Sequence, residues 1–411
     1  MTIYSQHVII NLLVLDRERK MNVKKIILFT GGVETLTFFS LQIKKALTAR
    51  GYKTFLFDIS EPFDSFQALL QFCRKGEGVL VTFNFIGLSG ESIFFQNGIS
   101  FFDEYAVKCL NIVVDHPFYY HEKLRHLPSD YLQFCIDRTH IAYMRRFFPH
   151  VTLGEFLPLA GTVSAQVQHK GCIPIAERKT DLLFVGNYTP PQHFEKQITR
   201  LGNDYTQFYY GIIDDLTAHS ELTMEQAFED HIKREIPDIS DADLAKCMEN
   251  MIFIDLYLRF TMRGRVIEVL ADNGFPIEVF GAGMELLSLR HPENLLLHGS
   301  TTSAVCLNKL SKAKISLNVM PWFKDGLHDR ILSASLNGAV SLTDTSGYLC
   351  EVFSENDLCC YSLKEIEKLP ETVTFLLEHP AHMQQLADNA KRICAAAHTW
   401  ENRVDVLESY L

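Results

Sequence analysis

Short apolar runs alternate with amphipathic stretches along most of the chain. From Lys25 the order is an apolar run at 26–30, the pair Gly31-Gly32, an amphipathic stretch to Arg50 and a second apolar run at 54–58. Continuous apolar runs of this length are typical of buried strands, and apolar residues spaced by three and four are typical of helices. The pattern therefore predicts a strand, a helix and a second parallel strand, with a glycine turn after the first strand.

The same alternation continues to about residue 165. Further strands are predicted at 78–84, 110–114, 131–135 and 152–156, with helical stretches such as 139–148 between some of them. Parallel strands joined by helices form a sheet that is covered on both faces. We therefore expect residues 22–170 to form one Rossmann-like, doubly wound domain.

A second α/β series follows a polar linker at 161–180. It begins with a strand at 181–187, pauses over a helical segment at 192–273, and resumes with strands at 276–280, 294–298, 314–319, 339–344 and 358–361. We expect a second Rossmann-like domain at 178–395 and a last helix at 396–411 that can cross back to the first domain. Two parallel-sheet domains of this kind enclose a cleft between them.

Residues 1–21 are expected to be an extension outside the fold, because a second methionine, Met21, stands just before the first strand. The apolar run 7–15 is interrupted by Asn11, is too short to span a bilayer, and is not followed by a small-residue cleavage site. No integral membrane segment is therefore expected.

Composition narrows the classes of partner. The 411 residues include 39 Lys and Arg against 50 Asp and Glu, which gives a net charge of −11 without a basic cluster. Such a chain is not expected to bind nucleic acid. The ten cysteines stand mostly inside apolar runs and lack zinc-type spacing, so we expect reduced thiols, a cytoplasmic location and no metal site.

The segment from Asn318 to Arg330 is the strongest candidate for an anion site. A buried strand at 314–319 leads through a loop into a helix from about residue 327 to 337, which Gly338 ends. The free N–H groups of such a helix start lie at the carboxyl edge of the sheet, where anions bind. Arg330 lies in the first turn, where the helix dipole disfavours a cation by roughly 0.3–1 kcal/mol unless an anion is bound.

An ion pair of Arg330 with Asp325 or Asp329 on a solvated face is the alternative at this point. Other strand ends in this half offer glycines, hydroxyl groups and an acid that could accept hydrogen bonds from a ribose. Ordinary turns and helix caps explain each of these singly. The predicted donor-binding residues are Gly186, Asn187, Thr189, Gly281, Gly283, His298, Asn318, Lys324, His328, Arg330, Asp344, Thr345, Ser346 and Glu351.

Two adjacent residues at the end of a strand in the first half are candidates for catalysis. Asp115 and His116 could each take a proton from an acceptor hydroxyl group. A hydrogen-bonded loop histidine before the rigid Pro117 is the alternative for His116. Asp137-Arg138, with His140 on the next turn, is a weaker candidate of the same kind.

The order of motifs in the second half resembles that of CgeB-type glycosyltransferases, the spore-maturation-protein-like branch of the GT-B enzymes, with a C-terminal domain of the glycosyltransferase family 1/4 type. The motifs that carry the resemblance are 314–319, 325–330, 337–344 and 348–353, with 181–187 and 114–118 as weaker matches. The resemblance covers 294–400 well and 110–190 loosely.

The resemblance implies transfer of a sugar from a UDP-, GDP- or dTDP-linked donor to a protein or glycan hydroxyl group, with no metal or other cofactor. It implies that Arg330 contacts the donor diphosphate, that residues 344–346 contact the sugar or the phosphates, and that Glu351 contacts the ribose. Many relatives carry a glutamate three or four residues after the position of Arg330, whereas this chain has Ser333 and Ala334.

Two other functions fit the same scaffold. One is a nucleotide-sugar epimerase, and the other is a non-catalytic, sugar-nucleotide-binding assembly protein, which the missing glutamate favours. A NAD-dependent dehydrogenase is disfavoured because the sequence at 31–35 lacks the GxGxxG spacing. Oligomeric state has no signature in the sequence.

Overall fold

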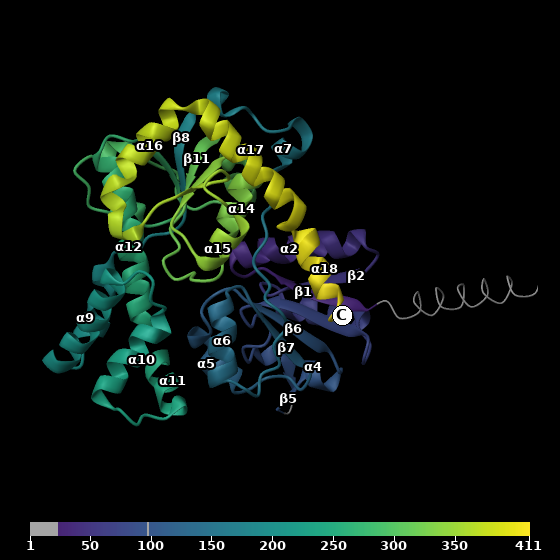
Figure 1. Ribbon diagram of the computed structural model, residues 1–411. Helices are drawn as coiled ribbons and strands as arrows, with labels where there is room; N and C mark the ends of the chain where they lie inside the picture. Colours follow the sequence, from purple (N-terminus) through teal and green to yellow (C-terminus); the bar gives the residue numbers. More distant parts are fainter. Residues whose placement is uncertain (1–23, 97) are drawn as a thin grey trace, which may run out of the picture.

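Two parallel β-sheets, each flanked by helices, form the two halves of the molecule (Figure 1). The structure is a computed structural model, and it describes residues 24–96 and 98–411. The predicted fold class, two Rossmann-like domains with a helical insertion in the second, is confirmed. The extension expected at residues 1–21 lies outside the described residues.

The N-terminal sheet has the strand order β2-β1-β3-β6-β7. Its strands are β1 (Lys25–Thr30), β2 (Lys53–Asp58), β3 (Gly78–Phe83), β6 (Lys108–Val113) and β7 (Tyr131–Cys135), and its main helices are α2 (Glu34–Ala49), α3 (Pro62–Phe72) and α6 (Arg138–Phe147). Short elements complete this half: α4 (Phe101–Glu104), α5 (His121–Leu124) and the hairpin of β4 (Phe95–Gln96) and β5 (Ile99–Ser100).

The strand predicted at 152–156 is wrong. Only one bridge, between Gln133 and Leu153, continues the sheet beyond β7. The apolar residues of this segment, Leu153 and Phe156, are half-buried, whereas the flanking Val151 and Leu157 are buried. Backbone hydrogen bonds to β7 are still present, because the N–H of Gln133 donates to the carbonyl of Thr152 and the N–H of Gly154 donates to the carbonyl of Gln133, but the pairing is too short to form a strand.

The C-terminal sheet has the strand order β10-β9-β8-β11-β12-β13. Its strands are β8 (Thr180–Val185), β9 (Ile277–Phe280), β10 (Leu295–Leu297), β11 (Ala313–Leu317), β12 (Val340–Thr343) and β13 (Cys359–Cys360). Its helices are α13 (Ser303–Leu310), α14 (Asp329–Leu336), α15 (Gly347–Val352), α16 (Leu369–Glu378) and α17 (Pro380–Ala397). The order reverses beside β8, and such a switch point opens a crevice at the carboxyl ends of the strands.

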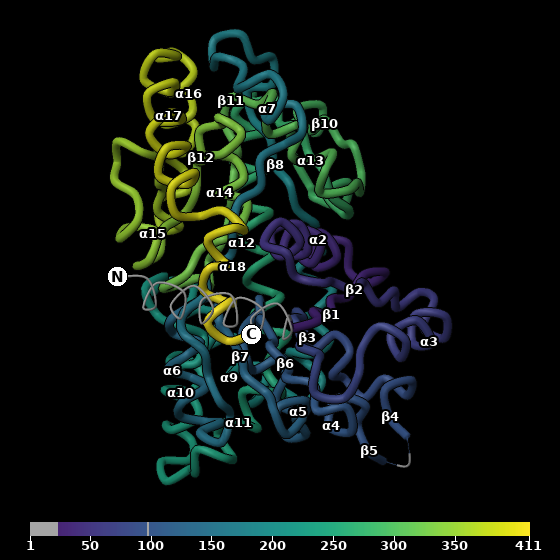
Figure 2. The backbone as a smooth tube through the Cα atoms, turned by 90° about the vertical axis from the view of Figure 1, so that its right-hand side faces the viewer, coloured from purple at the N-terminus to yellow at the C-terminus, as the bar shows by residue number. Residues whose placement is uncertain are grey.

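The helical insertion packs on the N-terminal half, although it follows β8 in the sequence. It consists of α8 (Glu195–Thr199), α9 (Asn203–Ala218), α10 (Met224–Glu235), α11 (Asp241–Glu249) and the first turns of α12 (Ile252–Asp272). Phe228 and Met248 of the insertion share one apolar core with Phe118 and Tyr143 of the N-terminal half. Figures 1 and 2 both show α10 and α11 beside α6. Arg146 of α6 forms ion pairs with Glu229 of α10 and Asp241 of α11, each at 2.6 Å.

Helix α12 joins the two cores. Ile254 and Leu258, near its start, lie in the core shared by the insertion and the N-terminal half, whereas Val266 and Leu270 lie in the core of the C-terminal sheet. A helix of 21 residues spans about 30 Å. One continuous helix therefore crosses between the halves, and its middle turns lie at the boundary.

The last helix, α18 (Trp400–Glu408), leaves the C-terminal half and lies beside α2 (Figure 1). The Trp400 ring packs on those of Phe39 and Phe83, with centroids 5.0 and 6.5 Å away. Arg50 binds Asp405 and Glu408. Helix α18 thus packs on the N-terminal half. Within residues 24–96 and 98–411, no helix is both long and apolar enough to cross a lipid bilayer.

Replacing Trp400 by alanine should lower the free energy of unfolding by about 3–5 kcal/mol, because Trp400 is 5 % exposed and fills the N-terminal core. Urea unfolding followed by circular dichroism measures the change. Phe375→Ala is the matched control, since Phe375 is 51 % exposed and its removal should change the value by about 0.5 kcal/mol or less. Equal losses in the two variants would contradict the assignment of α18 to the N-terminal core.

Candidate functional site

A cleft lies between the two halves. It consists of two adjoining cavities of about 560 and 680 Å³, and Asp115, Arg259, Arg263, Asp329 and Arg330 line both. The first cavity lies between the N-terminal half, the insertion and the loop before α14. The second lies between α2, α13 and the loops after β8 and β9. Residues from both halves and from α12 thus meet at one place.

Three arginines converge in this cleft. Arg259 and Arg263 are one turn apart on α12, and Arg330 lies in the first turn of α14. Arg259 is paired with the buried Asp255 at 2.6 Å. In the part of the chain that the structure describes, neither Arg263 nor Arg330 has a carboxylate oxygen within 4.0 Å of its guanidinium, so neither forms a salt bridge, although the charge of the neighbouring Asp329 acts on Arg330 and raises its pKa against the larger lowering by burial.

The hydrogen bonds of these two arginines go to backbone carbonyls. Arg330 Nη1 donates to the carbonyl of Val185 at 2.8 Å, and Arg263 Nη1 donates to the carbonyl of Asn187. Nε of Arg263 is buried and has no partner among the described residues. The two β8-end carbonyls hold the guanidinium groups in place but do not neutralise their charges.

Burial and mutual repulsion make these cations unfavourable until an anion enters. Loss of hydration lowers the pKa of Arg263 to about 9, and the charges of Arg330 and Arg259 act in the same direction. Loss of hydration also lowers the pKa of Arg330. Asp325, one alternative partner for Arg330, lies 3.5 Å from Arg138 instead. The cleft is therefore suited to a ligand with two negative charges.

Some of the predicted donor-binding residues gather beside Arg330. Gly186, Asn187 and Gly281 line the same cavity. The two glycine loops touch, because a Cβ on Gly281 would lie 2.2 Å from the carbonyl oxygen of Gly186. Gly283, with a φ of 89°, is equally close to the Tyr188 carbonyl. The glycines allow the ends of β8 and β9 to approach, and this contact shapes the cavity floor.

Other predicted donor-binding residues support the loop before α14. The side chain of Asn318 forms a hydrogen bond with the imidazole of His328 at 3.0 Å, and its amide N–H donates a second one to the hydroxyl of Thr343. Asp344 accepts from the N–H of Met320 at 2.7 Å, and burial raises the pKa of its carboxyl group to about 7. Ser346 donates to the carbonyl of Gly326. These side chains fix the course of residues 318–328 around the cleft.

The remaining predicted residues are not brought together with Arg330. Lys324 and Thr345 line a separate cavity of about 550 Å³, where the Lys324 ammonium donates to the carbonyls of Ser220 and Pro321. Glu351 forms a two-pronged pair with Arg138 on the outside of α15. His298 stacks on Phe280 at the rim, 39 % exposed, and Thr189 lines neither cleft cavity.

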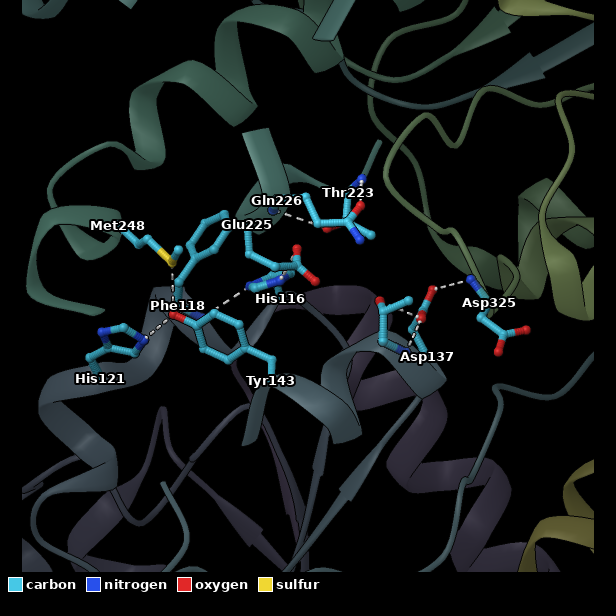
Figure 3. Close-up of polar contacts among 11 residues, drawn as sticks. His116, Phe118, His121, Asp137, Tyr143, Thr223, Glu225, Gln226, Met248 and Asp325 are labelled. Carbon is cyan, nitrogen blue, oxygen red and sulfur yellow. Dashed lines mark hydrogen bonds and ion pairs between the residues drawn. The ribbon is translucent and has the colours of Figure 1, made fainter. Parts of the chain in front are cut away.

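The two catalytic candidates differ in the atoms they offer. His116 accepts the N–H of Phe118 at Nδ1 and faces Glu225 at Nε2, 3.2 Å away, so both ring nitrogens are engaged (Figure 3). Asp115 accepts from Asn84 at 2.8 Å and from Tyr120 at 3.0 Å, and both bonds go to Oδ2. Within the described ranges Oδ1 makes no hydrogen bond, so Asp115 is the candidate with an available oxygen.

Several cleft residues were not predicted from the sequence. Arg259 and Arg263 had a usable signal, since two arginines four residues apart on an otherwise apolar helical stretch must share one face. Glu225 had none. It lies in the first turn of α10, where the capping box of Thr223 and Gln226 sets the helix start. Its contact with His116 depends on the docking of the whole insertion.

Unsatisfied polar atoms concentrate in the cleft. Four buried side-chain nitrogen or oxygen atoms in the described ranges lack a hydrogen-bond partner, and three of them belong to residues that line the first cavity: His140, Arg263 and Trp322. Buried polar groups are nearly always paired in folded proteins. Their clustering makes the cleft the candidate ligand site of the described residues.

Comparisons with known proteins agree with this location. Residues 263–409 match a family model described as glycosyl transferase-like, and this segment contains Arg263 and Arg330. A search of curated protein sequences gave no match.

Solved structures share the architecture at low identity. An alpha-glucosyltransferase in complex with UDP is 10% identical, with 94% of this chain and 99% of that chain covered and a TM-score of 0.52. An alpha-glucosyltransferase with UDP and a 13-mer DNA is 12% identical, with 93% and 99% covered and a TM-score of 0.52. Sucrose-phosphate synthase from Thermosynechococcus elongatus is 12% identical, with 94% and 98% covered and a TM-score of 0.48.

At these identities the structural likeness establishes the fold, which is the GT-B architecture of two Rossmann-like domains. The matched segment adds the class of enzyme, because residues 263–409 match a model described as glycosyl transferase-like. The predicted enzyme class, a glycosyltransferase, is confirmed at this level.

Replacing Arg263 or Arg330 by alanine should weaken the binding of inorganic pyrophosphate by roughly tenfold to a hundredfold, the usual contribution of a hydrogen bond to a charged group. Titration calorimetry measures the affinity. Arg265→Ala is the matched control, because Arg265 lies on the same helix, is 55 % exposed and pairs with Glu367 outside the cleft. Unchanged affinity in both cleft variants would rule out the anion site.

Proposed function

We propose that this protein transfers a sugar from a nucleotide-sugar donor to a hydroxyl group of a glycan or protein, without a metal ion. The observation that carries the proposal is the pair of arginines, Arg263 and Arg330, that lie in the cleft without a salt bridge. In this proposal the C-terminal half from about residue 178 binds the donor, and the N-terminal half up to about residue 170 faces the acceptor.

The donor diphosphate lies between the two guanidinium groups and the start of α14. Arg330 and the free N–H groups at the start of α14 then bind the same anion. The anion offsets the unfavourable interaction between the Arg330 cation and the positive end of the helix dipole. The nucleoside occupies the cavity beside the glycine loops, where Ser300 and Thr301 also face it. UDP is the first nucleotide to test, because the solved alpha-glucosyltransferases of this fold contain it.

The arginines also explain how the leaving group is stabilised. Departure of the nucleoside diphosphate places additional negative charge on the oxygen that was bonded to the sugar. Two fixed cations in a poorly hydrated cleft stabilise this charge strongly, and they need no reorganisation when it develops. Metal independence is proposed on this ground.

Asp115 is the proposed base. It lines both cavities and therefore lies where an acceptor hydroxyl group can approach a sugar whose diphosphate is held by Arg263 and Arg330. Its Oδ1 is available, and Asn84 and Tyr120 hold the carboxylate through Oδ2. In the transfer step Oδ1 takes the hydroxyl proton, the hydroxyl oxygen forms the new bond to the anomeric carbon, and the bond to the diphosphate breaks.

Two finer assignments complete the proposal. Membership of the CgeB-like branch rests on the order of motifs from 314 to 353, all of which lie inside the matched segment. A cytoplasmic location rests on the scattered cysteines, which are free in the described residues. The epimerase and the non-catalytic binder remain outcomes of the experiments below rather than second proposals.

Asp115→Asn should lower kcat by roughly a hundredfold to ten-thousandfold, the usual contribution of a general base, while the affinity for UDP stays unchanged. Transfer of labelled sugar and calorimetry measure the two quantities. Asp64→Asn, at an exposed position on α3, is the control. An unchanged kcat would show that Asp115 is not the base. Conversion of the free sugar nucleotide into its epimer, without any acceptor product, would identify an epimerase.

Treatment with EDTA should leave the transfer rate unchanged, because the arginines supply the charge that stabilises the leaving diphosphate. The rate is measured with and without chelator on protein freed of metal by dialysis. If EDTA abolished transfer and added Mg²⁺ or Mn²⁺ restored it, metal independence would be contradicted, whereas the assignment of the donor site would still hold.

A further inference from the structure

One carboxylate reaches the second cavity from the N-terminal half. Glu34 is the first residue of α2, shortly after the glycine pair 31–32 that follows β1. Its Oε1 accepts the N–H of Ser303 and its Oε2 accepts the hydroxyl of Ser303, each at 2.7 Å. Ser303 begins α13, which lies against α2 (Figure 2). Two hydrogen bonds to the C-terminal half therefore hold the carboxylate of Glu34 at the cavity wall.

The lining of the two cavities places Glu34 on the nucleoside side of the proposed donor site. Within the described residues, the carboxylates that line the second cavity are those of Glu34, Asp115 and Asp329. Asp115 and Asp329 also line the first cavity, whereas Glu34 lines the second alone. Ser300 and Thr301, which face the proposed nucleoside position, belong to the loop that leads into α13. Glu34 is thus the carboxylate beside the nucleoside.

The carboxylate of Glu34 can accept further hydrogen bonds. An ionised carboxylate offers about four lone-pair sites on its two oxygens, and each oxygen of Glu34 accepts one bond in the structure. The side chain is exposed, so its other lone pairs are open to a ligand. A ribose carries hydroxyl groups on two adjacent carbons, and acidic side chains accept from ribose hydroxyls in nucleotide-binding folds. A fixed carboxylate with a free site on each oxygen suits such a diol.

The acid that the sequence assigned to the ribose lies elsewhere. Glu351 accepts from both Nη atoms of Arg138, at 2.5 and 3.1 Å, and lines neither cleft cavity. In the part of the chain that the structure describes, Asp329 is the only carboxylate of the C-terminal half that lines the second cavity. It stands directly beside Arg330, at the proposed diphosphate position. An acid for the ribose must therefore come from the N-terminal half.

We propose that Glu34 binds the ribose diol of the donor, so that the donor is a ribonucleotide such as a UDP- or GDP-sugar and not a dTDP-sugar. The inference rests on the proposed function and adds the class of nucleotide. A dTDP-sugar lacks the 2′-hydroxyl group, so it leaves one oxygen of Glu34 without a partner. The same contact makes the N-terminal half take part in binding the donor.

Titration calorimetry on the full-length protein tests the class of nucleotide. The probes are UDP, GDP, the 2′-deoxy form of each, and dTDP. Whichever of UDP and GDP binds more tightly should exceed its 2′-deoxy form by about tenfold to a hundredfold in affinity, the usual contribution of a hydrogen bond to a charged group. We expect dTDP to bind as weakly as the 2′-deoxy forms. Equal affinities for the ribose and deoxyribose forms would overturn the inference.

Variants of Glu34 test the residue itself. Glu34→Ala should reduce the preference for ribose to less than about twofold, and Glu34→Gln should keep part of it, because one oxygen can still accept. Glu351→Ala is the matched control and should keep the full preference. Inorganic pyrophosphate has no ribose and should bind the Glu34 variants as tightly as the native protein. A purely structural role of Glu34 at the start of α13 would leave the preference unchanged.

Two results would contradict the assignment of Glu34. One is a preference for ribose that survives Glu34→Ala, and the other is a preference that disappears in Glu351→Ala.

Failure of the inference and failure of the proposed function give different results. If the protein binds the ribose and deoxyribose forms equally, the ribose assignment fails and the donor site stands. If the protein binds none of UDP, GDP and dTDP, the proposed function itself fails. Binding without consumption of any sugar nucleotide would identify a non-catalytic binder.

Discussion

The organisation of this molecule depends on holding two cations, Arg263 and Arg330, together in a poorly hydrated cleft where neither forms a salt bridge. Loss of hydration and mutual repulsion both oppose that arrangement, so other contacts must fix it. Helix α12 supplies them for Arg263, because apolar side chains before and after the arginine are buried in different cores. Arg330 is fixed by the strand-loop-helix unit of the C-terminal sheet. The unfavourable pair is therefore maintained by packing, and in the proposed function the charge of the donor diphosphate would offset it.

This constraint explains why the insertion lies where it does. A helix anchored in one core only could turn its arginines toward solvent. Because α12 enters the core shared with the N-terminal half, Arg259 and Arg263 face the cleft, and the same docking brings Glu225 onto His116. The segment that looks like an interruption of the second domain in the sequence thus completes the first domain in space.

The parts of the fold that depend on local pattern could be predicted. The sheet strands, the helix after residue 327 and its end at Gly338 each follow from apolar periodicity and from residues within one turn. Arg330 was found for the same reason, since its strand, loop and helix are contiguous. The strand expected at 152–156 failed because its pairing with β7 is limited to one bridge, and an apolar pattern does not give the length of the pairing.

The rest of the site depends on contacts between distant segments. Nothing near Glu225 or His140 indicates which surface they meet, because 85 residues separate them and only the docked insertion brings them together. Glu351 shows the converse case. Its position after a predicted loop suggested a ribose contact, but the side chain pairs with Arg138 of the other half. Spacing along the chain fixes which helix carries a residue, whereas tertiary packing decides which face of that helix meets the ligand.

The course of α12 and α18 has a consequence for how this protein can be divided. The segment that resembles other glycosyl transferase domains begins at residue 263, in the middle of α12, and ends at 409, inside the N-terminal half. A protein cut at these boundaries would split α12 between Arg259 and Arg263 and would leave Trp400 without its core. The segment defined by sequence similarity therefore does not coincide with a unit that packs as one piece. A gene fusion or domain exchange cut at the boundaries of that segment would break α12 and the N-terminal core.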